Sequence, residues 1–321
     1  MDNHAKNGAY RRSVELLLKL HLLTRDGQGE TAEADDVRDA SEEPWWQMSE
    51  EEKQRFRCLS EDLKTLEPDA RLEHLPAGDH ISEDGRRRIE HFLSRRDWEA
   101  ILGFLRDHAE QVPADLAAYY RGRCWAELGD HLAAIEFSRV AAAHQVDFAP
   151  AQILPLVLTE QVSEAVAVTE RLIARMAQMH PYSVLLLANS CCILADKTGG
   201  TRQRIWLQRA VDSFGHAFAR IEEYRGRGIA LELEPRNYVA LALCQHFLGN
   251  RDEARRAAEK ALELDPKEPH ALILRGLYAQ GLLAYAEPKE SAEVNEIEQG
   301  LWNVLSQQAI SPMPIPFPLA A

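Results

Sequence analysis

The sequence has few of the residues that build turn-rich or disulfide-bonded folds. Its 321 residues include only 17 glycines, 15 prolines and five cysteines. So few turn-forming residues argue against a fold of many short strands. Five cysteines without a CxxC spacing argue against a disulfide framework or a zinc site. We therefore predict reduced, packed thiols, a cytoplasmic location, and neither a cofactor nor a metal.

Long apolar runs are also missing. The most apolar stretch, residues 184–195, contains Asn189 and Ser190, whereas a helix needs roughly 20 apolar residues to span a bilayer. The opening residues, Met-Asp-Asn-His, do not lead from a basic stretch into an apolar run, as a secretory signal does. We expect no membrane partner.

The motifs of the common enzyme classes do not occur. The sequence has no HExxH, GxSxG or GxGxxG, and Lys197 precedes Gly199 and Gly200, whereas a phosphate-binding loop places its Lys after the glycines. One polar segment could gather metal ligands, but its spacing matches no tetrahedral zinc pattern, so a solvated loop is the better interpretation. The residues of this segment are Glu73, His74, Asp79, His80 and Asp84. An enzyme with a dispersed site stays an alternative.

The net charge of −14 disfavours binding to phosphate backbones, which depends on Lys and Arg. Residues 197–227 are an exception, with seven basic against three acidic side chains and interleaved aromatic residues. Such a mixture is typical of nucleic-acid readers. However, Trp206, Phe214 and Phe218 recur near helical spacing, which favours a buried stripe. A nucleic-acid-binding regulator is therefore a second alternative.

Helix-forming residues dominate the composition, and a helical repeat is visible between Pro235 and Glu268. In its first half, four residues recur at the spacing of one face of a helix, and Gly249 marks the end of that helix. Its second half carries a stripe of small residues, and Pro266 closes the unit. The first face consists of Tyr238, Leu241, Ala242 and Gln245, and the second of Ala254, Ala258, Ala261 and Leu262.

A second copy extends from about Asp115 to Phe148. It repeats the order of small residues, a large aromatic residue and a glycine turn. Small residues at Gly122 and Ala134 would let two antiparallel helices approach closely, with Trp125 beside them. The matching positions are Gly122, Trp125, Gly129, Ala134 and Ala141.

Both copies resemble the tetratricopeptide repeat. The resemblance implies an all-α fold, a right-handed α-solenoid of antiparallel helix pairs, in which each unit buries its faces against its neighbours. Weaker helical patterns complete a predicted array of six pairs, with Pro155 shortening one helix. The remaining patterns cover residues 83–94 and 97–111, 148–179, 181–195 and 202–224, and 269–285 and 291–307.

The two ends differ from the array. Residues 10–24 and 45–66 have amphipathic helical patterns, and Ser49 with Glu52 forms a capping box. We expect the acidic link between them to stay exposed or mobile, and Trp45 or Trp46 to anchor the segment on the solenoid. The front end resembles that of uncharacterised bacterial repeat proteins, which implies no activity. The predicted division is residues 1–80 as a cap, 81–308 as the array and 309–321 as a proline-rich tail.

A concave groove is the predicted functional surface. In tetratricopeptide arrays the first helices of successive pairs line this surface, so their solvent-facing residues meet ligands. The family's clamp for acidic C-termini needs Lys and Asn where Val239 and Leu243 stand, so that clamp is absent. A hydrogen-bonded core residue is an equal interpretation of Asn189. We predict a non-catalytic scaffold that binds a protein or peptide, lined by Leu116, Tyr119, Arg123, Glu127, Asn189, Arg236, Val239 and Leu243.

Overall fold

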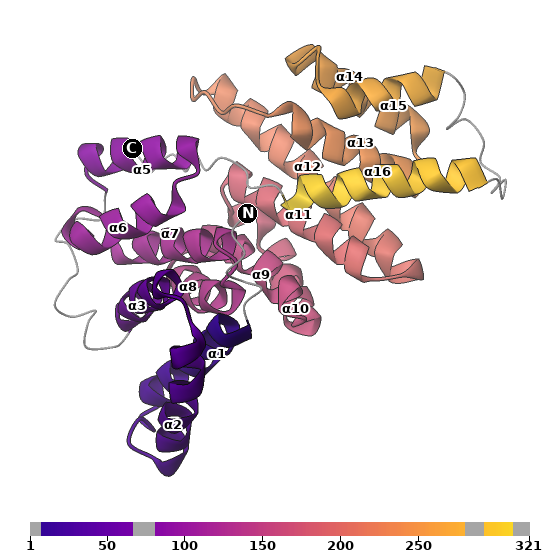
Figure 1. Cartoon of the computed structure of the whole chain (residues 1–321). Coiled ribbons are helices and arrows are strands. Elements are labelled where there is room, and N and C mark those ends of the chain that lie inside the picture. Colours follow the sequence, from indigo (N-terminus) through magenta and orange to yellow (C-terminus); the bar gives the residue numbers. More distant parts are fainter. Residues whose placement is uncertain (1–7, 67–80, 280–291, 311–321) are drawn as a thin grey trace. The chain divides into compact units, whose positions relative to one another are not determined.

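A computed structural model describes residues 8–66, 81–279 and 292–310 of the chain (Figure 1). Helices make up nearly all of these residues, and no strand occurs among them. The predicted all-α repeat class is therefore confirmed. The candidate metal-ligand segment except Asp84, and the proline-rich tail, lie outside the described residues. Asp84 forms an ion pair with Arg88.

The chain forms two compact units, which divide between Glu160 and Gln161. The helices of the N-terminal segment therefore belong to the same compact unit as the first repeats. The first unit contains α1 (Gly8–Arg25), α2 (Ala32–Gln47), α3 (Glu50–Lys64), α5 (Glu83–Arg95), α6 (Trp98–Asp107), η2 (Ala109–Gln111), α7 (Ala114–Glu127), α8 (His131–His144), η3 (Val146–Gln152) and α9 (Ile153–Leu158).

The second unit follows the same pattern of consecutive helices. The elements η3 and α9 before it are short, as expected where the chain carries Pro150 and Pro155. The second unit contains α10 (Val162–Ile173), η4 (Met176–Gln178), α11 (Pro181–Lys197), α12 (Gly200–Gly226), α13 (Pro235–Leu248), α14 (Arg251–Leu264), α15 (Pro269–Ala279) and α16 (Ala292–Ile310).

The pair α7 and α8 packs closely because small residues lie at its crossing. A Cβ atom added to Gly122 would lie 2.7 Å from Ser138 Oγ and 3.3 Å from the carbonyl oxygen of Ala134. Trp125 is 1% exposed beside this contact. Gly129 turns the chain with φ 93°, a conformation that favours glycine. The sequence prediction for this pair is confirmed.

Helix α3 is fixed to the first unit by a buried carboxylate. Asp62 is fully buried, and Trp125 donates its indole N–H to Asp62 at 3.0 Å. Arg106 and Arg121 form ion pairs with the same carboxylate at 3.2 and 3.4 Å. Burial raises the pKa of Asp62, while the two guanidinium groups oppose the shift. Such a network ties α3 to α6 and α7.

Helix α1 is attached by two further polar contacts. The Tyr10 hydroxyl donates to Asp130 Oδ2 at 3.0 Å in a buried environment. Arg25 forms an ion pair of 2.9 Å with Glu136, whose side chain is only 7% exposed. Together with the Asp62 network, these contacts join the N-terminal helices to α6, α7 and α8.

The acidic link is largely exposed, as expected, but most of it forms a helix, α2, which the sequence analysis did not predict. Thr31 caps the helix by accepting from the backbone N–H of Ala34, and acidic residues in the first turn favour the helix N-terminus. Ala34 and Val37 are buried, and Glu33 pairs with Lys19 of α1 at 2.8 Å. Local capping and packing on α1 thus outweigh the acidity of the segment.

The expected tryptophan anchors are wrong. Trp46 is 75% exposed, and Trp45 contacts Phe56 of α3 edge-on, with ring centroids 5.7 Å apart. These residues therefore pack within the N-terminal segment or face solvent. The capping box of Ser49 and Glu52 forms as predicted and starts α3.

In the second unit, α13 and α14 form the clearest repeat. Gly249 ends α13 in the left-handed region with φ 87°, and Ala254 and Ala261 are fully buried in α14. Between α11 and α13, the sulfur atoms of Cys192 and Cys244 lie 3.4 Å apart and both thiols are free. These features agree with the predicted helix pair and the predicted packed thiols.

The sequence analysis predicts that the last helix, α16, forms a sixth pair with α15. This prediction is wrong. Helix α16 packs mainly against α11 and α13, the first helices of two successive pairs (Figure 1). Helix α15 packs on α14 instead.

Candidate functional site

Two of the predicted groove residues on α7 belong to the core. Leu116 and Tyr119 are 3% and 1% exposed, and Tyr119 stacks on Phe148 of η3 with centroids 4.6 Å apart. Their predicted exposure is therefore wrong, because η3 folds back onto this face of α7. Arg123 and Glu127 stay partly exposed and form an i,i+4 pair at 3.8 Å.

The predicted groove residues of the second unit are mostly buried as well. Val239 and Leu243 are fully buried and Asn189 is 6% exposed, so the expectation that they face solvent is wrong. Arg236 stays partly exposed beside Glu234, with which it forms an ion pair. The helices that carry Asn189, Val239 and Leu243 are α11 and α13, the two that α16 covers. The structure thus places a helix where the sequence predicts an open groove.

A polar contact fixes α16 at the end of α11. Trp302 donates its indole N–H to Asp196 Oδ1 at 2.6 Å, and the Ser306 hydroxyl donates to the same oxygen at 3.1 Å. Trp302 and Ser306 lie one helical turn apart, so both donors can reach one acceptor. Asp196 was missed by sequence reasoning, because only the position of α16 gives this carboxylate a role.

An apolar contact completes the attachment of α16. The ring of Trp302 packs edge-on against Phe247 of α13, with centroids 4.7 Å apart. Leu301 and Leu305, also one turn apart, are 5% and 1% exposed. The arrangement is that of an amphipathic helix lying in a hydrophobic groove. We call the surface formed by Asp196, Phe247 and the facing sides of α11 and α13 the α16 groove.

A cleft adjoins the α16 groove. It measures about 600 Å³, lies beside Trp302, and has the first turns of α12 as part of its wall. Its walls carry apolar, amide and guanidinium groups, so it can accept a further side chain. The lining residues are Gly200, Gln203, Arg204, Leu207, Phe247, Gln299 and Trp302.

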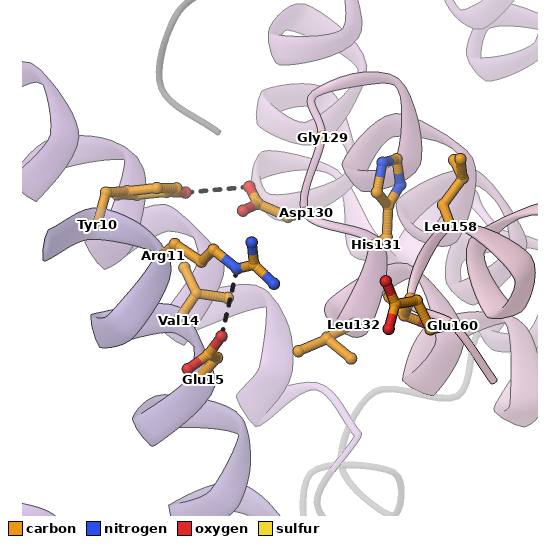
Figure 2. A pocket seen from close by; sticks show the side chains of 11 residues that line it. Tyr10, Arg11, Val14, Glu15, Gly129, Asp130, His131, Leu132, Leu158 and Glu160 are labelled. Carbon is orange, nitrogen blue, oxygen red and sulfur yellow. Dashed lines mark hydrogen bonds and ion pairs between the residues drawn. The ribbon is translucent and has the colours of Figure 1, made fainter. Parts of the chain in front are cut away.

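The first unit has a pocket of about 450 Å³ between α1 and the turn before α8 (Figure 2). Tyr10 is bonded to Asp130, and Arg11 pairs with Glu15 at 3.3 Å. Burial lowers the pKa of His131, which favours its neutral imidazole. Figure 2 shows the two contacts of Tyr10 with Asp130 and of Arg11 with Glu15, which join polar groups of the pocket wall to each other.

Several cations of the basic stretch of residues 197–227 make contacts within the second unit. Trp206 and Phe214 are buried, as the interpretation of a packed stripe predicts. Arg209 pairs with Glu170 at 3.1 Å, and Arg220 donates to two backbone carbonyls. Arg225 pairs with Glu222 at 2.5 Å. These contacts join the three arginine side chains to other groups of the second unit.

The described residues contain no cluster of three or more His, Cys, Asp or Glu side chains that could hold a metal. No helix among them has both the length and the apolar character needed to cross a bilayer. Burial raises the pKa of the Cys124 thiol, which keeps it protonated and unreactive.

Comparison with known proteins identifies one repeat. The tetratricopeptide repeat family model matches residues 235–268, which are α13, α14 and their flanking residues. No curated protein matches the chain. Tetratricopeptide repeats in general mediate protein–protein interactions and are not catalytic. The chain thus contains one matched tetratricopeptide repeat within an all-helical array of paired helices, which is a TPR-like architecture.

Proposed function

We propose that the chain is a non-catalytic interaction module or scaffold that binds an amphipathic helical segment of another protein in the α16 groove. The observation that carries this proposal is the helix already lying across α11 and α13. The matched repeat supports it, because tetratricopeptide arrays present the first helices of their pairs to ligands.

The chemistry of the groove specifies the ligand. Leu301 and Leu305 define two apolar positions one turn apart, and Trp302 adds an aromatic ring against Phe247. Aromatic side chains of this kind are common anchors of protein interfaces. Asp196 accepts from an N–H or O–H donor, so an acidic residue at this position of the ligand would be repelled. A helix with two leucine-sized residues and a donor-bearing aromatic residue fits.

The test uses a fluorescent peptide with the sequence of residues 292–310 and the full chain in which Trp302→Ala and Leu305→Ala weaken α16. Fluorescence anisotropy should report saturable binding of the peptide. Adding Phe247→Ala to the chain should weaken this binding about tenfold or more, since it removes an aromatic anchor. A peptide that carries Trp302→Ala and Leu305→Ala is the matched control and should bind weakly. Absence of binding by the unmodified peptide would refute the proposed site.

A further inference from the structure

We infer that α16 is an intramolecular competitor for the α16 groove, so that a partner helix binds only after α16 has left it. This inference rests on the proposed function and adds its regulation. It predicts a chain that is closed by its own C-terminal helix and opened by a ligand of matching chemistry.

The arrangement of the helix pairs makes departure of α16 feasible. Helix α11 packs on α12 and α13 packs on α14, and each pair is closed between consecutive helices. Helix α16 is an addition to these pairs and completes none of them. Its removal therefore leaves both pairs intact, unlike the removal of a repeat helix, which would expose its partner.

The polar attachment of α16 is accessible to water. The Asp196 side chain keeps 27% of its surface exposed and also lies 3.5 Å from Lys197 Nζ. When α16 leaves, water and Lys197 can therefore satisfy the carboxylate. A contact of this kind orients α16 on the groove without a large desolvation cost. A fully buried carboxylate would instead oppose the departure of the helix.

The cleft that adjoins the groove leaves room for a larger ligand. It measures about 600 Å³, and Gln299 and Trp302 of α16 form part of its lining. A partner helix with a larger side chain at the Gln299 position could fill the cleft and gain contacts that α16 does not make. Such a partner would bind the groove more tightly than α16 does, whereas α16 has the advantage of being covalently linked to the groove.

The covalent connection of α16 to the rest of the chain opposes binding of a free ligand. Residues 280–291 connect α15 to α16, and a short connection holds a ligand at an effective concentration on the order of mM. A free peptide with the α16 sequence must compete against this concentration. Its apparent affinity for the unaltered chain is then reduced by the fraction of chains that are open.

The test measures binding of the 292–310 peptide to full chains altered only on α16, so that the groove is constant. Ser306→Ala removes one donor, Trp302→Phe removes the indole donor but keeps a ring, and Trp302→Ala with Leu305→Ala removes the anchors. Peptide affinity should rise along this series, by about tenfold or more for the last chain. Glu296→Gln changes an exposed α16 residue and should leave the affinity unchanged.

The outcomes separate the two proposals. Equal peptide affinity for the unaltered chain and the whole series would overturn the inference while leaving the groove as a binding site. Absence of binding to every chain would overturn both. If the double substitution unfolds the chain, Trp302→Phe still decides. It should raise the peptide affinity while the unfolding midpoint stays within a few degrees, whereas a purely structural helix would lose stability without gaining a ligand.

Discussion

Each of the two units attaches an extra helix to its repeats through one aspartate, but the two aspartates differ in burial. Asp62 of the first unit is fully buried and binds two arginines and an indole. Asp196 of the second unit is partly exposed and binds an indole and a hydroxyl. A buried charge is costly to leave unpaired, whereas an exposed one is rehydrated. We therefore expect the first attachment to resist opening and the second to open more readily.

The largest effect that tests this contrast is removal of the N-terminal segment. A chain beginning at Ile81 lacks Tyr10 and Asp62, which leaves Arg121 buried at 5% exposure without its carboxylate. We expect this chain to aggregate or to melt at a clearly lower temperature in calorimetry. A chain ending at Ala279, which lacks α16, should stay monomeric by light scattering. If the chain beginning at Ile81 also stays monomeric and equally stable, the contrast is removed and residues 1–80 are a detachable arm.

Asp62→Asn should have the next largest effect. It leaves Arg106 and Arg121 without a charged partner, which costs about 3–5 kcal/mol in the free energy of unfolding. Urea denaturation followed by circular dichroism measures the loss. The matched control is Asp36→Asn on the exposed side of α2, which should change stability by less than about 0.5 kcal/mol.

The stability of the second unit should depend on pH through His246. Burial, and to a lesser degree the Arg251 charge, lower the pKa of His246 to about 4. The unfolded chain takes up this proton near pH 6.5, so stability is fully present above pH 6.5 and is lost as pH falls toward 4. We expect a loss on the order of 2–3 kcal/mol, visible as faster hydrogen exchange in α13 and α15. His246→Gln should flatten this dependence; an unchanged slope would contradict the assignment.

Gly122→Ala probes the repeat packing of the first unit. The new Cβ would approach Ser138 and the Ala134 carbonyl, and we expect a loss of about 1–2 kcal/mol. Gly103→Ala in α6 is the control, because its Cβ meets no atom within 4 Å, and it should stabilise by about 0.5–1 kcal/mol. If both substitutions stabilise the chain, the close crossing of α7 and α8 is disproved.

Asp196→Asn should have the smallest effect on stability. An amide oxygen can still accept from Trp302 and Ser306, and the site is partly hydrated, so we expect a loss below about 1 kcal/mol. Hydrogen exchange should nevertheless accelerate in α16 alone. A loss as large as that of Asp62→Asn would show that both attachments are permanent.

Local sequence features predicted the repeats well. Gly122, Gly249 and the Ser49 capping box each specify a structure within a few residues, through a close approach, a left-handed turn or a helix start. Helix α2 was missed because acidity was weighed above its cap at Thr31. The local sequence around Thr31 was sufficient to predict α2, but the acidic composition of the segment was given too much weight.

The candidate site was predicted only in part. The sequence indicated that the first helices of the pairs form the functional surface, but assigned exposure to Val239 and Leu243, which are buried. The contact between Asp196 and Trp302 joins residues 106 positions apart. No helical periodicity encodes such a pairing, because it depends on where α16 docks. The partner-binding role of Arg123, Glu127 and Arg236 stays a prediction.

The contact between Tyr10 and Asp130 has a consequence for the order of folding. It joins residues 120 positions apart, whereas α13 and α14 meet across a two-residue turn. Contacts distant in sequence require closure of a long loop and therefore form slowly, while local helix pairs form quickly. During synthesis, α1 leaves the ribosome long before the α7–α8 turn that it must contact. Its buried face then stays open to water, or to chaperones, until Asp130 emerges.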